Sequence, residues 1–212
     1  MKTASLKFLL LAVLSATSTG CVSFLTPHHE RRPAFVVVCQ RPAGPVLSSS
    51  QTNTLVRIRR FRSAEPFDTR RMMELDERTG QIKIIKEGEF AVPVATTASD
   101  AVRRWLDLSG LFAGVLDSSA VASGHSIALD GWIDQACVVI NKEGKKTFRL
   151  TLSIWLAERT QVKGASSGPF SYAYSRSIPL ASSEPKAISE AFAQALTEVL
   201  TEFEKSLVTR LN

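Results

Sequence analysis

Side chains that could carry chemistry are scarce in this chain of 212 residues, which contains three cysteines and three histidines. His28 and His29 lie in a short segment between two prolines, and His125 follows a glycine at the expected start of a strand. A metal site or a histidine-activated nucleophile needs further ligands or partners at set spacings, and none accompany these residues. The motifs H-E-x-x-H and C-x-x-C and a phosphate-binding glycine loop are missing too. The sequence therefore predicts no enzyme activity, no metal and no cofactor.

Two carboxylates, Asp130 and Asp134, are the remaining acid–base candidates. Their spacing of four residues on an expected strand puts them on one face, about 13 Å apart. That separation is too large for two carboxylates to share a proton. A hydrolase would predict that substituting His125 or Asp134 abolishes turnover, and we expect no turnover.

Cys21 is the one cysteine with a chemical context. Lys2 and Lys7 precede an apolar run from Phe8 to Leu14, and small residues up to Gly20 follow it. This order is typical of a secretory signal peptide. The apolar run would span about 10 Å as a helix, against a hydrocarbon core of about 30 Å, so it is too short for a permanent anchor. We predict that residues 1–20 are a signal peptide.

The segment Ser18-Thr19-Gly20-Cys21 resembles the lipobox of bacterial lipoproteins, although Ser18 stands where that family usually has an aliphatic residue. The resemblance implies that a diacylglycerol alkylates the Cys21 thiol before cleavage leaves it as the first residue. Ordinary signal cleavage after Gly20 is the alternative. We predict lipid attachment at Cys21 and a tether at residues 21–33, because more than one acyl chain anchors a protein stably. Val22, in place of an inner-membrane retention aspartate, favours the outer membrane.

The charge of the chain excludes a dedicated nucleic-acid binder. The formal charge is +6 and falls to +4 without Lys2 and Lys7, and an exported protein does not meet nucleic acid. The densest basic stretch is VRIRRFR at 56–62. Its arginines alternate with apolar residues, so we interpret it as the solvated side of a strand, with an anionic headgroup or acidic partner as the alternative.

Cys39 and Cys137 both lie in β-branched apolar runs, AFVVVCQ and ACVVIN. An exported protein can hold a disulfide, yet free cysteines are common in buried strands. Sequence leaves both readings open.

Hydrophobic periodicity predicts seven strands and two helices in the remainder. The expected strands are residues 34–40, 55–61, 72–75, 81–85, 125–141, 147–158 and 171–179. The expected helices are residues 94–109, closed by Gly110, and 185–211. We predict a single α/β (α+β) domain at 34–212, with a mixed, mostly antiparallel sheet and two main helices packed on one face.

Three segments resemble the ABC-type transport auxiliary lipoprotein component family: PFDTRRMMEL (66–75), FAVP (90–93) and RRWLDLSGLFAGVLD (103–117). The family motif W-L-x-x-S-G-L-F falls here on Trp105, Leu106, Ser109, Gly110, Leu111 and Phe112. The motif also has a structural reading, in which Gly110 ends the helix and Phe112 anchors the next strand in the core.

The resemblance implies a non-enzymatic lipoprotein of the paraquat-inducible type, which assists an ABC transporter and a mammalian-cell-entry-type protein in moving lipids between envelope membranes. It would be lipid-anchored in the cell envelope, facing the periplasm from the outer membrane, with a ring of identical subunits as one arrangement. The rival interpretation is a lipoprotein activator of a cell-wall synthesis enzyme. That function calls for a long disordered linker through peptidoglycan, and about a dozen tether residues are too few.

Overall fold

The computed structural model describes residues 32–43, 54–118, 126–158 and 170–211. The predicted signal peptide, Cys21, most of the predicted tether and the three histidines lie outside the described residues.

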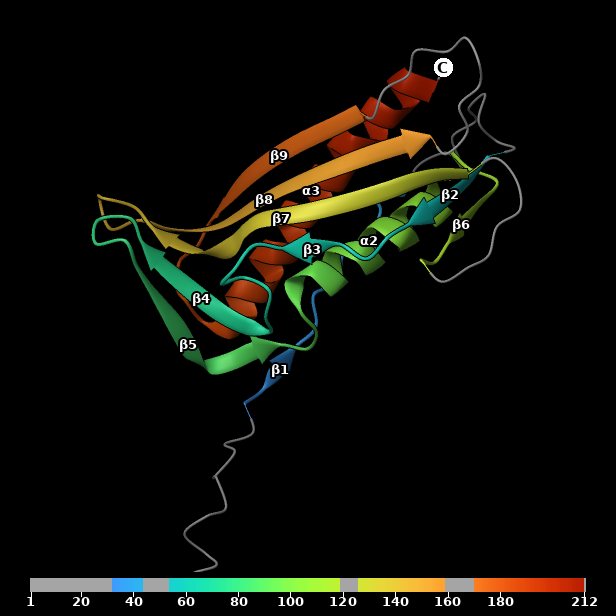
Figure 1. Ribbon diagram of the computed structural model, residues 1–212. Helices are drawn as coiled ribbons and strands as arrows, with labels where there is room; N and C mark the ends of the chain where they lie inside the picture. The colour runs from blue at the N-terminus through green and yellow to red at the C-terminus, as the bar shows by residue number, and fades with distance from the viewer. Residues whose placement is uncertain (1–31, 44–53, 119–125, 159–169, 212) are drawn as a thin grey trace, which may run out of the picture. The chain divides into compact units, whose positions relative to one another are not determined.

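A long strand, β7 (Ser126–Ile140), is the centre of a mixed, nine-stranded sheet (Figure 1). Along one edge it pairs antiparallel with β8 (Lys146–Glu158), which in turn pairs antiparallel with β9 (Phe170–Pro179). Three shorter strands run parallel to its other edge, and they are β2 (Leu55–Ile58), β3 (Arg62–Ser63) and β4 (Arg71–Asp76). Beyond them lie β5 (Gln81–Phe90), antiparallel to β4, β1 (Ala34–Phe35), parallel to β5, and β6 (Gly114–Leu116), parallel to β2. The longest ladders are antiparallel, which confirms the predicted sheet.

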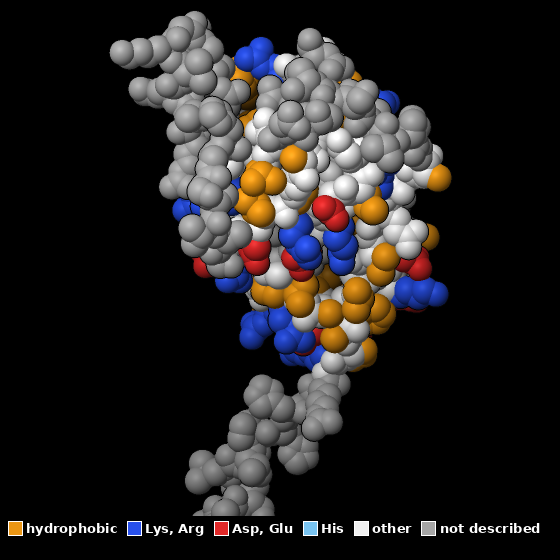
Figure 2. Space-filling view, turned by 90° about the vertical axis from the view of Figure 1, so that its right-hand side faces the viewer, with side chains coloured by type: hydrophobic (Ala, Val, Ile, Leu, Met, Phe, Trp, Pro, Cys, Tyr) orange, Lys and Arg blue, Asp and Glu red, His pale blue; other side chains and the backbone are white. Residues whose placement is uncertain are grey.

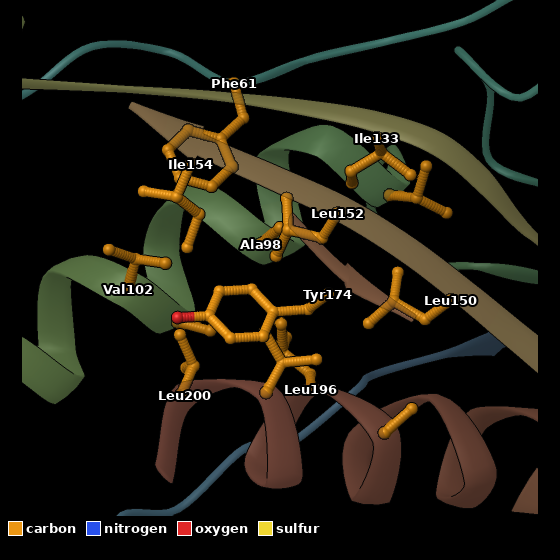
Figure 3. Packing of buried hydrophobic residues seen from close by; sticks show 14 of the residues in the cluster. Phe61, Ala98, Val102, Ile133, Leu150, Leu152, Ile154, Tyr174, Leu196 and Leu200 are labelled. Atoms are coloured by element: carbon orange, nitrogen blue, oxygen red, sulfur yellow. The ribbon is translucent and has the colours of Figure 1, made fainter. Parts of the chain in front are cut away.

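Two helices, α2 (Val94–Ser109) and α3 (Pro185–Leu211), have the bounds that the periodicity predicts. Their apolar stripes enter one hydrophobic cluster with the inward side chains of β8, so both helices cover the same face of the sheet. Figure 3 shows Ala98 and Val102 of α2 and Leu196 and Leu200 of α3 converging below Leu152. α2 ends at Gly110, whose φ of 71° is the left-handed conformation that glycine adopts without a Cβ clash.

The predicted first strand at 34–40 is too long. Only Ala34 and Phe35 pair with β5, and the chain then leaves the sheet. Cys39 Sγ lies 3.3 Å from Thr197 Oγ1 of α3, so the segment from residue 36 onward runs over the helices. Side-chain contacts with α3 replace the expected hydrogen-bond ladder. Alternating apolar residues occur both in a paired strand and in an extended segment packed on a helix, so the sequence pattern cannot distinguish them.

The predicted strand at 55–61 is too long: β2 ends at Ile58 and β3 begins at Arg62, because Phe61 between them turns its side chain into the core. The Phe61 backbone N–H donates to Ser99 Oγ of α2 at 2.8 Å, in place of a ladder bond. Its ring occupies the space above Gly131 of β7, where an added Cβ would lie 2.3 Å from the ring. The close approach of Phe61 therefore requires a glycine at position 131, in the middle of β7.

The predicted strand at 125–141 has an irregularity that a two-residue period does not foresee. The register of β7 against β8 shifts between Ile133 and Gln135. Leu129 and Ile133 face the helices before the shift, and Ala136 and Val138 face them after it. The alternation thus changes parity at Asp134, as a β-bulge causes.

The inverted parity places Cys137 and Val139 on the opposite face of the sheet, where they form a second small cluster with Met73. Cys39, by contrast, packs against the main core beside α3. Both cysteines are free thiols. The sheet lies between them, so of the two readings left open, the free form is the one observed.

The predicted strands at 72–75 and 81–85 are confirmed, and they form an antiparallel hairpin with longer arms in β4 and β5. Gly80 has a φ of 70° in its turn, where a residue without a Cβ is favoured.

We predict that Gly131→Ala destabilises the protein by about 1–3 kcal/mol, because the new methyl group overpacks the core against Phe61. The free energy of unfolding, measured by chemical denaturation, checks this. In a Gly131→Ala, Phe61→Ala double variant the clash is absent, so the loss should be smaller than the sum of the single losses. Additive losses would contradict the proposed contact.

Candidate functional site

The family-like motif closes α2 and turns the chain toward β6. Ser109 Oγ donates to the Leu106 carbonyl at 2.8 Å and accepts from the Leu111 N–H at 3.2 Å, on either side of the left-handed Gly110. Leu111 and Phe112 are buried in the main cluster. The hydroxyl thus satisfies backbone groups that the end of a helix leaves unpaired. These residues have a structural role at the position where the sequence placed them.

Trp105 connects this motif to the rest of the helical layer. Its Nε1–H donates to Glu204 Oε2 of α3 at 2.5 Å, and Arg41 donates to both oxygens of the same carboxylate at 2.8 Å. The Arg41 and Glu204 side chains are only 10% and 14% exposed. This Trp105–Glu204–Arg41 cluster joins α2, α3 and the segment that follows β1.

The electrostatics of the cluster favour the charged carboxylate. Burial alone would raise the pKa of Glu204, but hydrogen bonds from Arg41 and Trp105 outweigh it, and the pKa lies below its ordinary value. Bidentate pairing with a guanidinium is among the stronger hydrogen-bonding arrangements. Glu204 is therefore an anion at neutral pH and holds the segment at Arg41 in place.

A groove of about 440 Å³ lies next to the cluster, between residues 36–41 and α2. Its walls include Val36, Val38 and Leu108, whose side chains are 69%, 59% and 62% exposed. Burial raises the pKa of the Cys39 thiol in this groove, against the opposing effects of Thr197 and Arg104. A protonated thiol is a poor nucleophile, so burial does not activate Cys39 for reaction.

A second hollow, of about 350 Å³, lies between the β2 end, α2 and the end of β6. It is lined by Arg59, Arg60 and Arg103 and by Asp100 and Asp117. Because charges of both signs line this hollow, it favours neither an anion nor a cation as a ligand. The neighbouring Val56, Ile58 and Phe61 are buried while Arg59, Arg60 and Arg62 are exposed, but Arg57, the one arginine of β2, is half-buried.

Neither acidic candidate of β7 has a catalytic partner among its recorded contacts. Asp130 pairs with Arg59 at 3.4 Å, and Asp134 accepts from Trp132 Nε1 at 3.0 Å. Within the described ranges, no three histidine, cysteine or acidic side chains could hold a metal ion together. No helix in this part of the chain is long and apolar enough to cross a membrane.

The sequence GASSG at 164–168 also matches the G-x-S-x-G pattern of serine hydrolases. It belongs to the connection between β8 and β9, which are antiparallel neighbours. A nucleophile elbow joins a strand to a helix, so the surrounding elements do not fit that motif. The five residues themselves lie outside the described part of the chain.

The structure brings the six motif residues together at the end of α2, whereas Cys21 lies outside the described residues. Sequence reasoning missed Arg41 and Glu204. They are 163 positions apart, and no local pattern pairs residues at such a distance. Glu204 follows Phe203 in the apolar stripe of α3, and a carboxylate beside a buried stripe is the one signal that could have drawn attention to it.

Comparison with solved structures finds the same fold in other proteins. Protein XCC0632 from Xanthomonas campestris, of the DUF330 family, superposes with a TM-score of 0.66 at 20% identity, over 83% of this chain and 94% of that one. An uncharacterised protein superposes with a TM-score of 0.57 at 10% identity, over 77% of this chain and 99% of its own. No protein-family model matches the sequence, and no curated protein is significantly similar to it. These likenesses establish the fold alone.

We expect Glu204→Gln to lower the free energy of unfolding by about 1–3 kcal/mol at pH 7, because hydrogen bonds to a charged group are lost. A carboxyl with a depressed pKa stabilises the fold above its ordinary pKa of about 4.3, and this contribution disappears as the pH falls through the folded-state value. The difference between the two proteins should therefore shrink between pH 7 and pH 3 in urea denaturation.

Glu190→Gln is the matched control on α3. Its carboxylate lies 4.0 Å from Lys186 and is 67% exposed, so the expected loss is below about 0.5 kcal/mol. Equal losses in the free energy of unfolding would show that the Trp105–Glu204–Arg41 cluster stabilises the fold no more than an exposed ion pair does.

Proposed function

We propose that this protein is a membrane-anchored auxiliary lipoprotein of an ABC-type intermembrane lipid transport system. It acts by docking, without catalysis, and its partners are an ABC transporter and a mammalian-cell-entry-type protein. The place of action is the cell envelope, on the periplasmic side of the outer membrane. A ring of identical copies is one arrangement in which such a domain could meet a transport conduit.

One observation carries the proposal: Cys21 stands directly after a signal-like segment, and the chain that follows bears the family-like motif at residues 105–112. The contacts of the motif residues support the proposal. Trp105 joins α2 to α3, and Ser109 and Gly110 close α2 before β6. An adaptor needs a rigid body, a tether and an exposed surface.

We predict that Cys21→Ala abolishes membrane anchoring, because the substitution removes the thiol that would carry the lipid. The checks are the intact mass of the membrane-extracted protein and its distribution between membrane and soluble fractions. The native protein should begin at Cys21 and carry acyl chains. The variant should carry no acyl chains. If its signal segment is cleaved, it should leave the membrane fraction; if the segment stays uncleaved, the intact mass will show it.

Ser18→Ala is a suitable control, since it keeps a small residue before the cysteine and should leave both readouts unchanged. A native chain of unmodified mass, cleaved and soluble, would contradict the anchored function.

A further inference from the structure

The most exposed large hydrophobic side chains of the described residues lie on the segment after β1 and on α2. Val36, Val38 and Leu108 have the largest exposures of this kind, and all three line the groove beside Trp105. We refer to Val36, Val38 and Leu108 as the proximal patch. Figure 2 shows hydrophobic side chains gathered in the lower part of one face, among lysine and arginine side chains.

The two valines of the proximal patch are held outward. Val37, between them, is buried in the main core. Farther along, Cys39 contacts Thr197 and Arg41 is paired with Glu204. The segment cannot turn its valines inward without breaking these contacts. Single exposed hydrophobic residues are ordinary, but several fixed together favour a binding surface.

The charges beside the proximal patch include two arginines. Arg104 is exposed, lines the groove and lies close enough to Cys39 to affect its pKa. Arg32 precedes Val36 by four positions, and Asp107 is the exposed acid next to Leu108. Guanidinium groups around an apolar centre suit the headgroup region of a phospholipid surface, where the apolar side chains insert and the cations meet phosphate.

The course of the chain selects the membrane as the surface that the patch meets. The stretch from Cys21 to Arg32 spans at most about 40 Å even when fully extended. The proximal patch begins four residues later, so it includes the part of the fold nearest along the chain to the lipid. We propose that the proximal patch docks on the phospholipid surface to which Cys21 anchors the protein. This inference rests on the proposed function, because it takes Cys21 as the anchor.

The size of the proximal patch also favours a lipid surface over a second protein. A stable protein interface buries about 800 Å² on each partner, which far exceeds what three side chains supply. A tethered domain needs much less, because the anchor keeps it at a high effective concentration beside the membrane. Weak insertion of a few apolar side chains then suffices to orient the fold.

The test places a fluorescent label on the patch of the full, lipidated protein. Cys39 and Cys137 are replaced by serine, and Leu108→Cys is labelled with a nitrobenzoxadiazole dye. Ile84→Cys is the matched control, because Ile84 is 40% exposed on β5 outside the patch. Both proteins are placed in vesicles of phosphatidylethanolamine and phosphatidylglycerol that contain a doxyl-labelled phosphatidylcholine.

We expect the doxyl lipid to reduce the emission from position 108 by about half and to leave position 84 nearly unchanged, since side chains of a membrane-docked surface lie within about 10 Å of the acyl boundary. Adding Val36→Asp and Val38→Asp should remove most of the quenching at 108. Equal emission at both positions would overturn the inference. So would a label at 108 that is shielded from aqueous iodide but not quenched by the doxyl lipid, because a protein would then cover the patch.

The intact mass of the same samples separates the two proposals. A lipidated Cys21 without quenching at position 108 refutes the docking patch alone. An unlipidated chain refutes the anchored function as well, and with it the premise of the patch.

Discussion

The carboxylate of Glu204 is the group on which the arrangement of the helical layer depends. It receives hydrogen bonds from Trp105 on α2 and from Arg41 on the segment after β1, so three separate parts of the chain meet at one anion. Each partner lies in a largely apolar setting, where an unpaired charge would be costly. Satisfying the anion therefore fixes the helix pair and the first segment together. The path of residues 36–41 follows from this constraint.

The fixed first segment explains the character of the outer surface. If residues 36–40 had continued as an edge strand, their ladder would have extended the sheet beside β5. Because Arg41 is bound to Glu204 instead, the segment crosses the helices, and Val36 and Val38 face solvent next to Leu108. A rigid sheet and helix body with an exposed apolar surface suits the proposed adaptor, which would work by contact. Burial likewise raises the pKa of the Cys39 thiol and so keeps it protonated.

Most of the fold was predictable from the sequence because the periodicities of α2, α3 and β8 are local. Gly110 likewise predicted where α2 ends. The errors occurred where a distant residue decides the local conformation. Phe61 interrupts a strand because it packs against Gly131, and the parity change at Asp134 depends on pairing with β8. Of the candidate site, the motif at residues 105–112 was foreseen, but its partner Glu204 was not, since 99 positions separate it from Trp105.

The central claim is that this body serves a lipid transport complex of the envelope. The most direct measurement is chemical cross-linking in intact cells, followed by purification of the native lipidated protein and identification of its partners by mass spectrometry. The account predicts that subunits of an ABC transporter and a mammalian-cell-entry-type protein are recovered with it. Recovery of a cell-wall synthesis enzyme in their place would contradict the account and favour the activator function.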